Sequence, residues 1–133
     1  MEASGLAVKA LGKISLLINS AGFLLPEKSL RSVTRENLIK HFEINTIGPV
    51  LVAKHMQPSF MHDTKIVNIS ARTGSIGDNT GLGGWYSYRM SKAALNQATK
   101  TIAAEFGRKG MVHTIISLIK YLNPIYLYHL LLC

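Results

Sequence analysis

The sequence has one cysteine, Cys133, at its last position, so no disulfide framework is available to it. This cysteine usage is typical of a reducing compartment, and we expect the protein in the cytoplasm. The first residues, MEASGLAVKALGKISLL, carry Glu2 and contain no sustained apolar core. They therefore do not resemble a secretory signal peptide.

Acidic residues are also few, with 7 Asp and Glu against 15 Lys and Arg and a formal net charge of +8. The basic residues are scattered, and no basic stripe interleaved with aromatic residues is present. The densest pair, Arg108–Lys109, lies where a predicted helix ends, and cations there complement the helix dipole. We therefore expect no nucleic-acid partner, and no metal site is predicted.

A long uninterrupted hydrophobic run is absent as well. The most apolar stretch, 115–133, is interrupted by Lys120, Asn123 and Pro124. A membrane-spanning helix needs about 20 predominantly apolar residues, so we do not expect this stretch to cross a membrane.

What the chain does contain is the pattern of one α/β domain over residues 1–133. Three short apolar runs predict strands, at 14–18 (ISLLI), 65–70 (KIVNIS) and 111–118 (MVHTIISL). Helices are predicted at 35–55 and 85–108. Near-continuous apolar strands separated by long helical crossovers are typical of a parallel sheet. The fold class is therefore α/β, half of a doubly wound parallel sheet.

The ends of the two predicted helices have local signals. Thr34 precedes the first helix as an acceptable N-cap, and Gly110 follows the second as a stop signal. Within the first helix, Gly48–Pro49 predicts a kink, because proline lacks the amide donor and disfavours helix at the preceding residue.

The segment GGWYSYRMSKAAL (83–95) contains a candidate acid–base pair. Tyr88 and Lys92 have the i, i+4 spacing at which helical side chains meet, whereas Tyr86 has no such partner. A nearby ammonium favours a phenolate and so lowers the tyrosine pKa toward the range useful for proton transfer. The spacing alone also arises by chance, and the alternative is the edge of an alanine-rich packing helix.

The context of the pair favours chemistry over packing. It follows a strand and a glycine-rich loop, which places it at the carboxyl end of the sheet, where open α/β folds bind ligands. The first strand ends in NSAG (19–22), whose small residues let a ligand approach the backbone. Asn45 is a polar side chain among apolar neighbours and needs a buried partner.

The motifs NSAG (19–22), NTIG (45–48), VNIS (67–70) and YSYRMSKAALN (86–96) resemble, in order and spacing, the short-chain dehydrogenase/reductases. These are single-domain, NAD(P)-dependent oxidoreductases with a Rossmann fold. The resemblance spans about residues 14–112, and the segment 74–96 looks closest to the C-factor and carbonyl-reductase-like branch. It implies NAD or NADP as the cofactor, with NADPH slightly favoured, and a small carbonyl or alcohol substrate.

The resemblance also implies roles for single residues. Tyr88 would donate the proton to the carbonyl oxygen, and Lys92 would bind the nicotinamide ribose and lower the tyrosine pKa. Asn45 would anchor a water that links Lys92 to solvent. Cofactor-binding roles also fall on Asn19, Ala21 and Gly22, which would flank the adenosine side and brace the sheet. The alternatives are structural: Asn19 would only end a strand, and Asn45 would only bond backbone.

The sequence departs from the family pattern in three ways. The glycine-rich TGxxxGxG turn is absent, and the 115–133 stretch matches no family segment, so we expect a partial Rossmann domain that lacks the first βαβ unit and the C-terminal part. The catalytic serine falls on Ala71 when it is counted from the strand and on Ser75 when it is counted back from Tyr88. Strands tolerate insertions less than loops, which favours Ala71.

Three hypotheses follow for function. The first is an NAD(P)-dependent carbonyl reductase or dehydrogenase with the residues assigned above. The second is a catalytically inactive fragment that acts by association with a full-length paralogue. The third, which the interruptions in 115–133 disfavour, is a tail-anchored or membrane-associated version that uses that stretch. Homo-oligomers or paralogue pairs are expected through the two long helices, and the 14–18 strand is expected to form an unprotected apolar edge.

Overall fold

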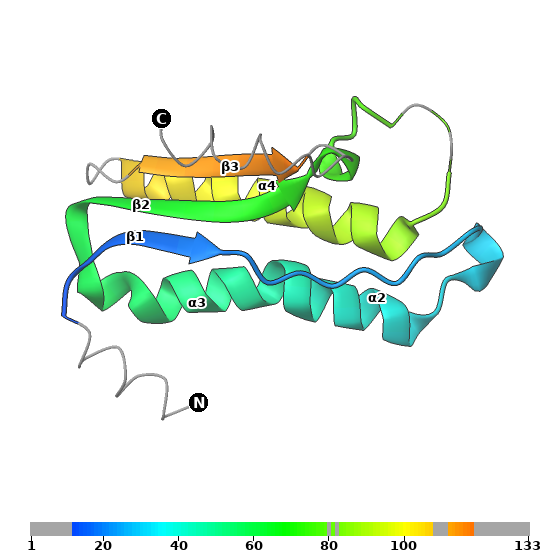
Figure 1. Cartoon of the computed structure of the whole chain (residues 1–133), viewed down its shortest axis with the longest axis horizontal. Helices are drawn as coiled ribbons and strands as arrows, with labels where there is room; N and C mark the ends of the chain where they lie inside the picture. Colours follow the sequence, from blue (N-terminus) through cyan, green and yellow to red (C-terminus); the bar gives the residue numbers. More distant parts are fainter. Residues whose placement is uncertain (1–11, 80, 82, 108–111, 119–133) are drawn as a thin grey trace.

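In this computed structural model, the described residues are 12–79, 81, 83–107 and 112–118. Three parallel strands form the sheet in the order β1 (Ile14–Asn19), β2 (Phe60–Ala71) and β3 (Val112–Leu118). Figure 1 shows them side by side with the helices along the sheet. The predicted α/β class and the parallel order of the three strands are confirmed.

Strand β2 is longer than the sequence pattern indicates, since it begins at Phe60 rather than at Lys65. The additional residues include exposed Met61, His62 and Asp63, which hide the strand from a pattern of apolar residues. Thr64 holds this extension in place, because its hydroxyl donates to the Ile14 carbonyl at 2.5 Å.

The first crossover is one helical run in three parts. These are α2 (Arg35–Phe42), a π-helical turn (Glu43–Ile47) and α3 (Gly48–Met56). The second crossover is the single helix α4 (Tyr86–Gly107). Short 3₁₀ turns lie at Leu30–Ser32, Gln57–Ser59 and Arg72–Gly74.

The start of α2 agrees with the sequence, because the Thr34 hydroxyl accepts the Asn37 amide at 3.1 Å. The irregularity predicted at Gly48–Pro49 takes a different form. The Gly48 amide bonds to the Glu43 carbonyl, five residues back, in a π-helical turn. Pro49, which has no amide to donate, then lies buried in the first turn of α3. The irregularity in the helix therefore lies at the π-helical turn just before Gly48–Pro49, and the predicted kink itself stays a prediction.

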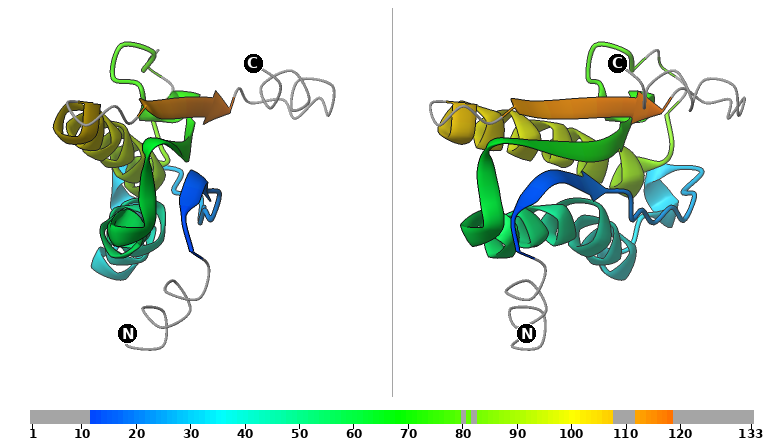
Figure 2. Two further views of the ribbon diagram at one scale, coloured as in Figure 1. Left: turned by 90° about the vertical axis from the view of Figure 1, so that its left-hand side faces the viewer. Right: turned by 60° about the vertical axis from the view of Figure 1, so that its left-hand side comes forward.

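The core lies between the sheet and the helices. Ala53, Phe60 and Ile66 are buried there, and Leu17 and Ile102 pack against them. Figure 2 shows α2, α3 and α4 on the same side of the sheet. Within the described part of the chain, no helix covers the other face. Two β1 side chains on that face, Leu16 and Ile18, are 50% and 44% exposed.

The described helices include none that is long and apolar enough to cross a membrane. Residues 115–118 of the apolar C-terminal stretch belong to β3. Residues 119–133 lie outside the described part, so the expectation for that segment stays a prediction.

Candidate active site

The predicted site residues come together at the carboxyl end of the sheet, from three different elements. Tyr88 and Lys92 come from α4, Asn45 from the π-helical turn, and Gly22 from the loop after β1. A Cβ atom on Gly22 would lie 4.0 Å from Lys92 Nζ and 3.9 Å from Asn45 Oδ1. Residues separated by 70 positions in sequence therefore face one small region.

Lys92 is nearly inaccessible, with 3% of its surface exposed, although lysine is almost never fully buried without a partner. Its Nζ donates to the Ile69 carbonyl at 2.8 Å and lies 5.8 Å from the centre of the Tyr88 ring. Burial lowers the pKa of the Lys92 ammonium. The carbonyl at the end of β2 thus fixes the direction in which the ammonium points.

Tyr88 is half-buried between two aromatic side chains. Its ring meets His41 edge-on at 6.2 Å and Trp85 at 6.3 Å between ring centres. Burial raises the pKa of the Tyr88 phenol. The expectation that Lys92 lowers this pKa is not met in this structure, because burial dominates and Lys92 Nζ bonds to the Ile69 carbonyl instead.

Asn45 is completely buried, as predicted. Its Oδ1 accepts the Phe23 amide at 2.7 Å, and its Nδ2 donates to the Phe23 carbonyl and to Ser91 Oγ, both at 2.9 Å. Asn45 therefore ties the loop after β1 to α4. The satisfaction of backbone groups, one of the two alternatives, is present, and the role as a water anchor stays a prediction.

In the NSAG segment (19–22), Asn19 makes hydrogen bonds within the fold, whereas Ala21 and Gly22 are exposed. Asn19 donates from Nδ2 to Asn68 Oδ1 at 2.7 Å, and Asn68 donates to the Thr99 hydroxyl of α4 at 2.8 Å. This chain of bonds braces β1, β2 and α4, in keeping with the expected bracing role. Ala21 and Gly22 are both exposed, and a Cβ atom on Gly22 would lie 4.0 Å from Lys92 Nζ, so the backbone of this loop lies close to the buried ammonium.

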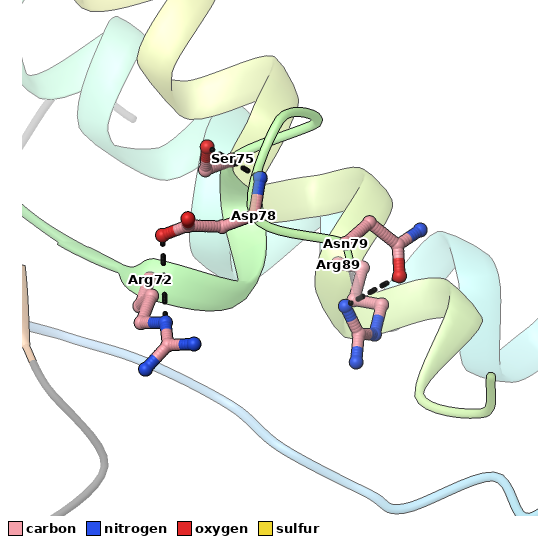
Figure 3. A network of polar contacts seen from close by, with 5 residues as sticks. All are labelled: Arg72, Ser75, Asp78, Asn79 and Arg89. Atoms are coloured by element: carbon pink, nitrogen blue, oxygen red, sulfur yellow. Dashed lines mark hydrogen bonds and ion pairs between the residues drawn. The ribbon is translucent and has the colours of Figure 1, made fainter. Parts of the chain in front are cut away.

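The family resemblance leaves two positions for the catalytic serine, Ala71 and Ser75, and these lie in different surroundings. Ala71 ends β2, directly after the carbonyl-bearing Ile69 and buried Ser70, whose hydroxyl donates to Asn96 on α4 at 2.6 Å. Ser75 is exposed on the following loop, and its hydroxyl accepts the Asp78 amide at 3.3 Å (Figure 3). This arrangement favours Ala71 as the position next to the site.

The rest of that loop is held by exposed polar contacts. Arg72 forms an ion pair with Asp78 at 3.4 Å, and Arg89 donates to Asn79 at 3.2 Å, as Figure 3 shows. The Arg72 and Asp78 side chains are each 54% exposed, and such pairs contribute about 0–1 kcal/mol. These contacts hold the loop in shape, and none of them involves the side chain of Tyr88 or Lys92.

Two buried residues near the pair are not found by the sequence analysis. Glu27 is 2% exposed and bonds to Ser87, one residue before Tyr88. His41 is fully buried, accepts the Leu25 amide and contacts the Tyr88 ring. Both lie in segments with the polar composition of a surface loop and a surface helix. The one available signal is the position of His41 four residues before Asn45, on the same side of the helix. Among the described residues, no three His, Cys, Asp or Glu side chains gather to hold a metal.

Residues 2–118 match the family model described as Enoyl-(Acyl carrier protein) reductase. Over 107 residues the chain is 34% identical to C-signal of Myxococcus xanthus, covering 79% of this chain and 64% of that protein. It is 31% identical over 99 residues to the 1-hydroxy-2-glutathionyl-2-methyl-3-butene dehydrogenase of Rhodococcus sp. (strain AD45), covering 74% and 43%.

The fold is similar to that of solved carbonyl reductases. The carbonyl reductase Sniffer of D. melanogaster aligns with a TM-score of 0.80 and 26% identity, over 87% of this chain and 54% of that one. The NADPH-bound carbonyl reductase from chicken fatty liver aligns with a TM-score of 0.75 and 27% identity, over 87% and 50%. The chain thus spans about half the length of these structures.

The parallel sheet, the helices along it and these matches define the class of the fold as an α/β Rossmann fold. The chain belongs to the short-chain dehydrogenase/reductase family and has part of its Rossmann fold.

Proposed function

We propose that this chain carries the acid–base half of an NAD(P)-dependent oxidoreductase that interconverts a small carbonyl compound and its alcohol. The observation that supports this function best is the convergence of Tyr88, Lys92 and Asn45 beside exposed Gly22. Two buried polar side chains and a half-buried phenol at the carboxyl end of a parallel sheet suit a reaction that needs one positioned proton.

The residues around Gly22 fit the nicotinamide ribose of a dinucleotide. Gly22 leaves a surface beside Lys92 Nζ that a side chain would narrow, and an ammonium suits ribose hydroxyl groups. Lys92 would hold the ribose, and Ala21 and Gly22 would lie along the cofactor. When bound, the nicotinamide supplies or accepts the hydride. NADP is the preferred form in this proposal, because similar solved structures carry NADPH, including the chicken liver carbonyl reductase.

Tyr88 supplies the proton in this proposal. In carbonyl reduction the carbonyl carbon gains the hydride, and the carbonyl oxygen takes the proton of the Tyr88 phenol. Burial raises the pKa of Tyr88, so the phenol holds its proton at neutral pH. Carbonyl reduction is therefore the direction favoured near pH 7, whereas alcohol oxidation needs the phenolate and gains rate as pH rises.

The test starts with binding of NADPH and NADH to the full chain, measured by cofactor fluorescence and calorimetry. Turnover is then measured with a panel of aldehydes and ketones. We expect Tyr88→Phe to bind the cofactor as the parent does and to lose about 10²–10⁴-fold in rate, the usual contribution of a general acid. Tyr86→Phe is the matched control, because Tyr86 lies two residues away without a lysine partner, and its rate should stay within twofold. Absence of cofactor binding would overturn the proposal and favour the inactive, paralogue-associated alternative.

We further propose that copies of the chain, or a copy and a longer relative, pair through α3 and α4. The groove between these helices is lined mainly by small and apolar side chains, and Leu51 and Val52 of α3 are 39% and 37% exposed nearby. Ala98→Arg in this groove should abolish pairing in sedimentation analysis, while Lys100→Glu on the exposed side of α4 should not.

A further inference from the structure

The helix that carries Tyr88 begins without a cap of its own. Trp85 precedes the first residue of α4, and its carbonyl accepts the Arg89 amide at 2.9 Å, as an N-cap residue does. An indole has no acceptor oxygen, so it cannot satisfy the free amides of the first turn. Trp85 is also held at φ +55°, a conformation that non-glycine residues rarely adopt.

Glu27, from the loop after β1, supplies the missing acceptor. Its Oε2 accepts the Ser87 amide at 2.8 Å, and its Oε1 accepts the Ser87 hydroxyl at 2.5 Å. The Glu27 main-chain carbonyl also accepts the Trp85 amide at 2.7 Å. A Cβ atom on Gly84 would lie 2.8 Å from that same carbonyl oxygen, so the two segments are in direct contact. One residue thus caps the start of α4 from 60 positions away.

The Glu27 carboxylate is itself firmly held. Only 2% of the residue is exposed, and Asn37 of α2 donates to Oε1 at 2.7 Å. Burial acts to raise the pKa of Glu27, but the hydrogen bonds from Ser87 and Asn37 outweigh it and leave the pKa below its ordinary value. The group is therefore an anion at neutral pH, and an anion at a helix N-terminus is stabilised by the helix dipole.

Tyr88 lies between two such attachments. On one side Glu27 holds Ser87, and on the other Asn45 joins Phe23 to Ser91. Both attachments connect α4 to the loop after β1, which contains Gly22, the residue beside Lys92. The position of the phenol relative to that loop therefore depends on both.

We propose that Glu27 is a positioning residue for Tyr88. From the loop after β1, it caps the N-terminus of α4 and so fixes the phenol relative to Gly22 and Lys92. This inference rests on the proposed function. Loss of the cap lets the first turn of α4 and its phenol move, and misplacement of a catalytic group by about 1 Å costs about 10²-fold in rate. The cost falls on kcat, because Lys92 and Gly22 still receive the cofactor.

Two variants and two controls test this role in the full chain. Glu27→Gln keeps the size of the side chain but removes its charge and replaces one acceptor oxygen with a donor, so it cannot accept all three of the bonds that Glu27 accepts. Ser87→Ala is milder, because it removes only the hydroxyl bond. Thr34→Ala removes the N-cap of α2, and Glu36→Gln neutralises an exposed first-turn carboxylate of α2. The controls thus repeat the loss of a cap and of a charge on α2, and both keep the Asn37 side chain that donates to Glu27.

The first readout is steady-state kinetics with NADPH and an aldehyde at a temperature where every variant is folded by circular dichroism. We expect kcat to fall about 10- to 100-fold in Glu27→Gln and about 3-fold in Ser87→Ala, with KM changed less than twofold. Both controls should keep the parent kcat. Equal losses in Thr34→Ala and Glu27→Gln would show that the effect is only on stability and would overturn the proposal.

The second readout needs no turnover. The titration of the Tyr88 phenol is followed by NMR of ¹³C-labelled tyrosine, with the signal assigned by its loss in Tyr88→Phe. Glu27→Gln loosens the packing of the ring, and the greater exposure lowers the Tyr88 pKa relative to the parent, because burial is what raises it. Thr34→Ala should leave it unchanged. An unshifted Tyr88 titration in Glu27→Gln overturns the inference, whereas absence of turnover in the parent chain defeats only the proposed function.

Discussion

Ala71 ends the strand whose Ile69 carbonyl orients Lys92, and at this position the family resemblance places the serine that polarises the substrate carbonyl. Restoring that hydroxyl by Ala71→Ser should add one hydrogen-bond donor at the carbonyl oxygen. Donors of this kind contribute about 10²–10³-fold in rate, and we expect at least a tenfold gain in kcat because the surroundings are not adapted to the new side chain.

The matched variant is Ser75→Ala, on the exposed loop after β2. Its hydroxyl accepts the Asp78 amide, and its removal should leave kcat within twofold. If Ser75→Ala instead loses more than tenfold while Ala71→Ser gains nothing, then Ser75 serves as the donor and the strand-based alignment is wrong.

The Glu27 carboxylate also makes the stability depend on pH. Hydrogen bonds hold its folded pKa below the ordinary value of 4.5, so its contribution is fully present above about pH 4.5. The contribution is lost as pH falls through the lowered folded value, because the protonated group no longer accepts all three bonds. Urea unfolding between pH 6 and pH 3 should show a decline in the free energy of unfolding that is smaller in Glu27→Gln. A parallel decline in parent and variant would contradict this assignment.

At the scale of elements, the contact between the Arg72–Gly74 turn and α4 sets the distance from the end of β2 to Lys92. A Cβ atom on Gly74 would lie 2.8 Å from Lys92 C and 2.9 Å from Lys92 Cβ, closer than packed atoms approach. Gly74→Ala must therefore push the turn away from α4, at a cost of about 1–3 kcal/mol in the free energy of unfolding. The proposed binding of the cofactor by Lys92 should weaken as well.

Gly77 offers the control on the same loop, since a Cβ atom there would meet only Ser75 Oγ, at 4.0 Å. Gly77→Ala should change the midpoint of urea unfolding little and leave cofactor affinity unchanged. Equal effects of the two substitutions would mean that loop flexibility, rather than the contact with Lys92, determines the loss.

The elements that the sequence predicts are those whose signals are local. Apolar runs predict all three strands, and Thr34 marks the start of α2 correctly. Asn45 is predicted as buried because its neighbours are apolar, and it is fully buried. The start of α4 lacks a local cap signal, because Glu27 accepts the Ser87 amide from a loop 60 residues away. The sequence pattern predicts Glu27 to be an ordinary surface residue. The first residues of β2 are missed for a related reason. They show no alternation of apolar residues in the sequence, and a hydrogen bond from Thr64 to β1 holds them in the strand.

At the scale of the whole molecule, the described sheet has one covered face and one open face. Leu16 and Ile18 lie on the open face of β1, while Leu17 between them packs into the core. In the described part of the chain β1 pairs only with β2, so its other edge presents free backbone groups beside exposed apolar side chains. This agrees with the apolar edge predicted from the sequence, and such edges favour association with other chains.

Charges on the open face should therefore suppress association without unfolding the chain. We expect Ile18→Lys to lower the light scattering of concentrated samples and to shift elution in size-exclusion chromatography toward the monomer. Leu17→Lys places the same charge in the core and should unfold the protein, while Ile76→Lys, at an 87% exposed loop position, should leave association unchanged. If Ile76→Lys reduces scattering as much as Ile18→Lys does, then added net charge accounts for the effect. If neither reduces it while Ala98→Arg does, association runs through α3 and α4, and the open face of β1 contributes nothing.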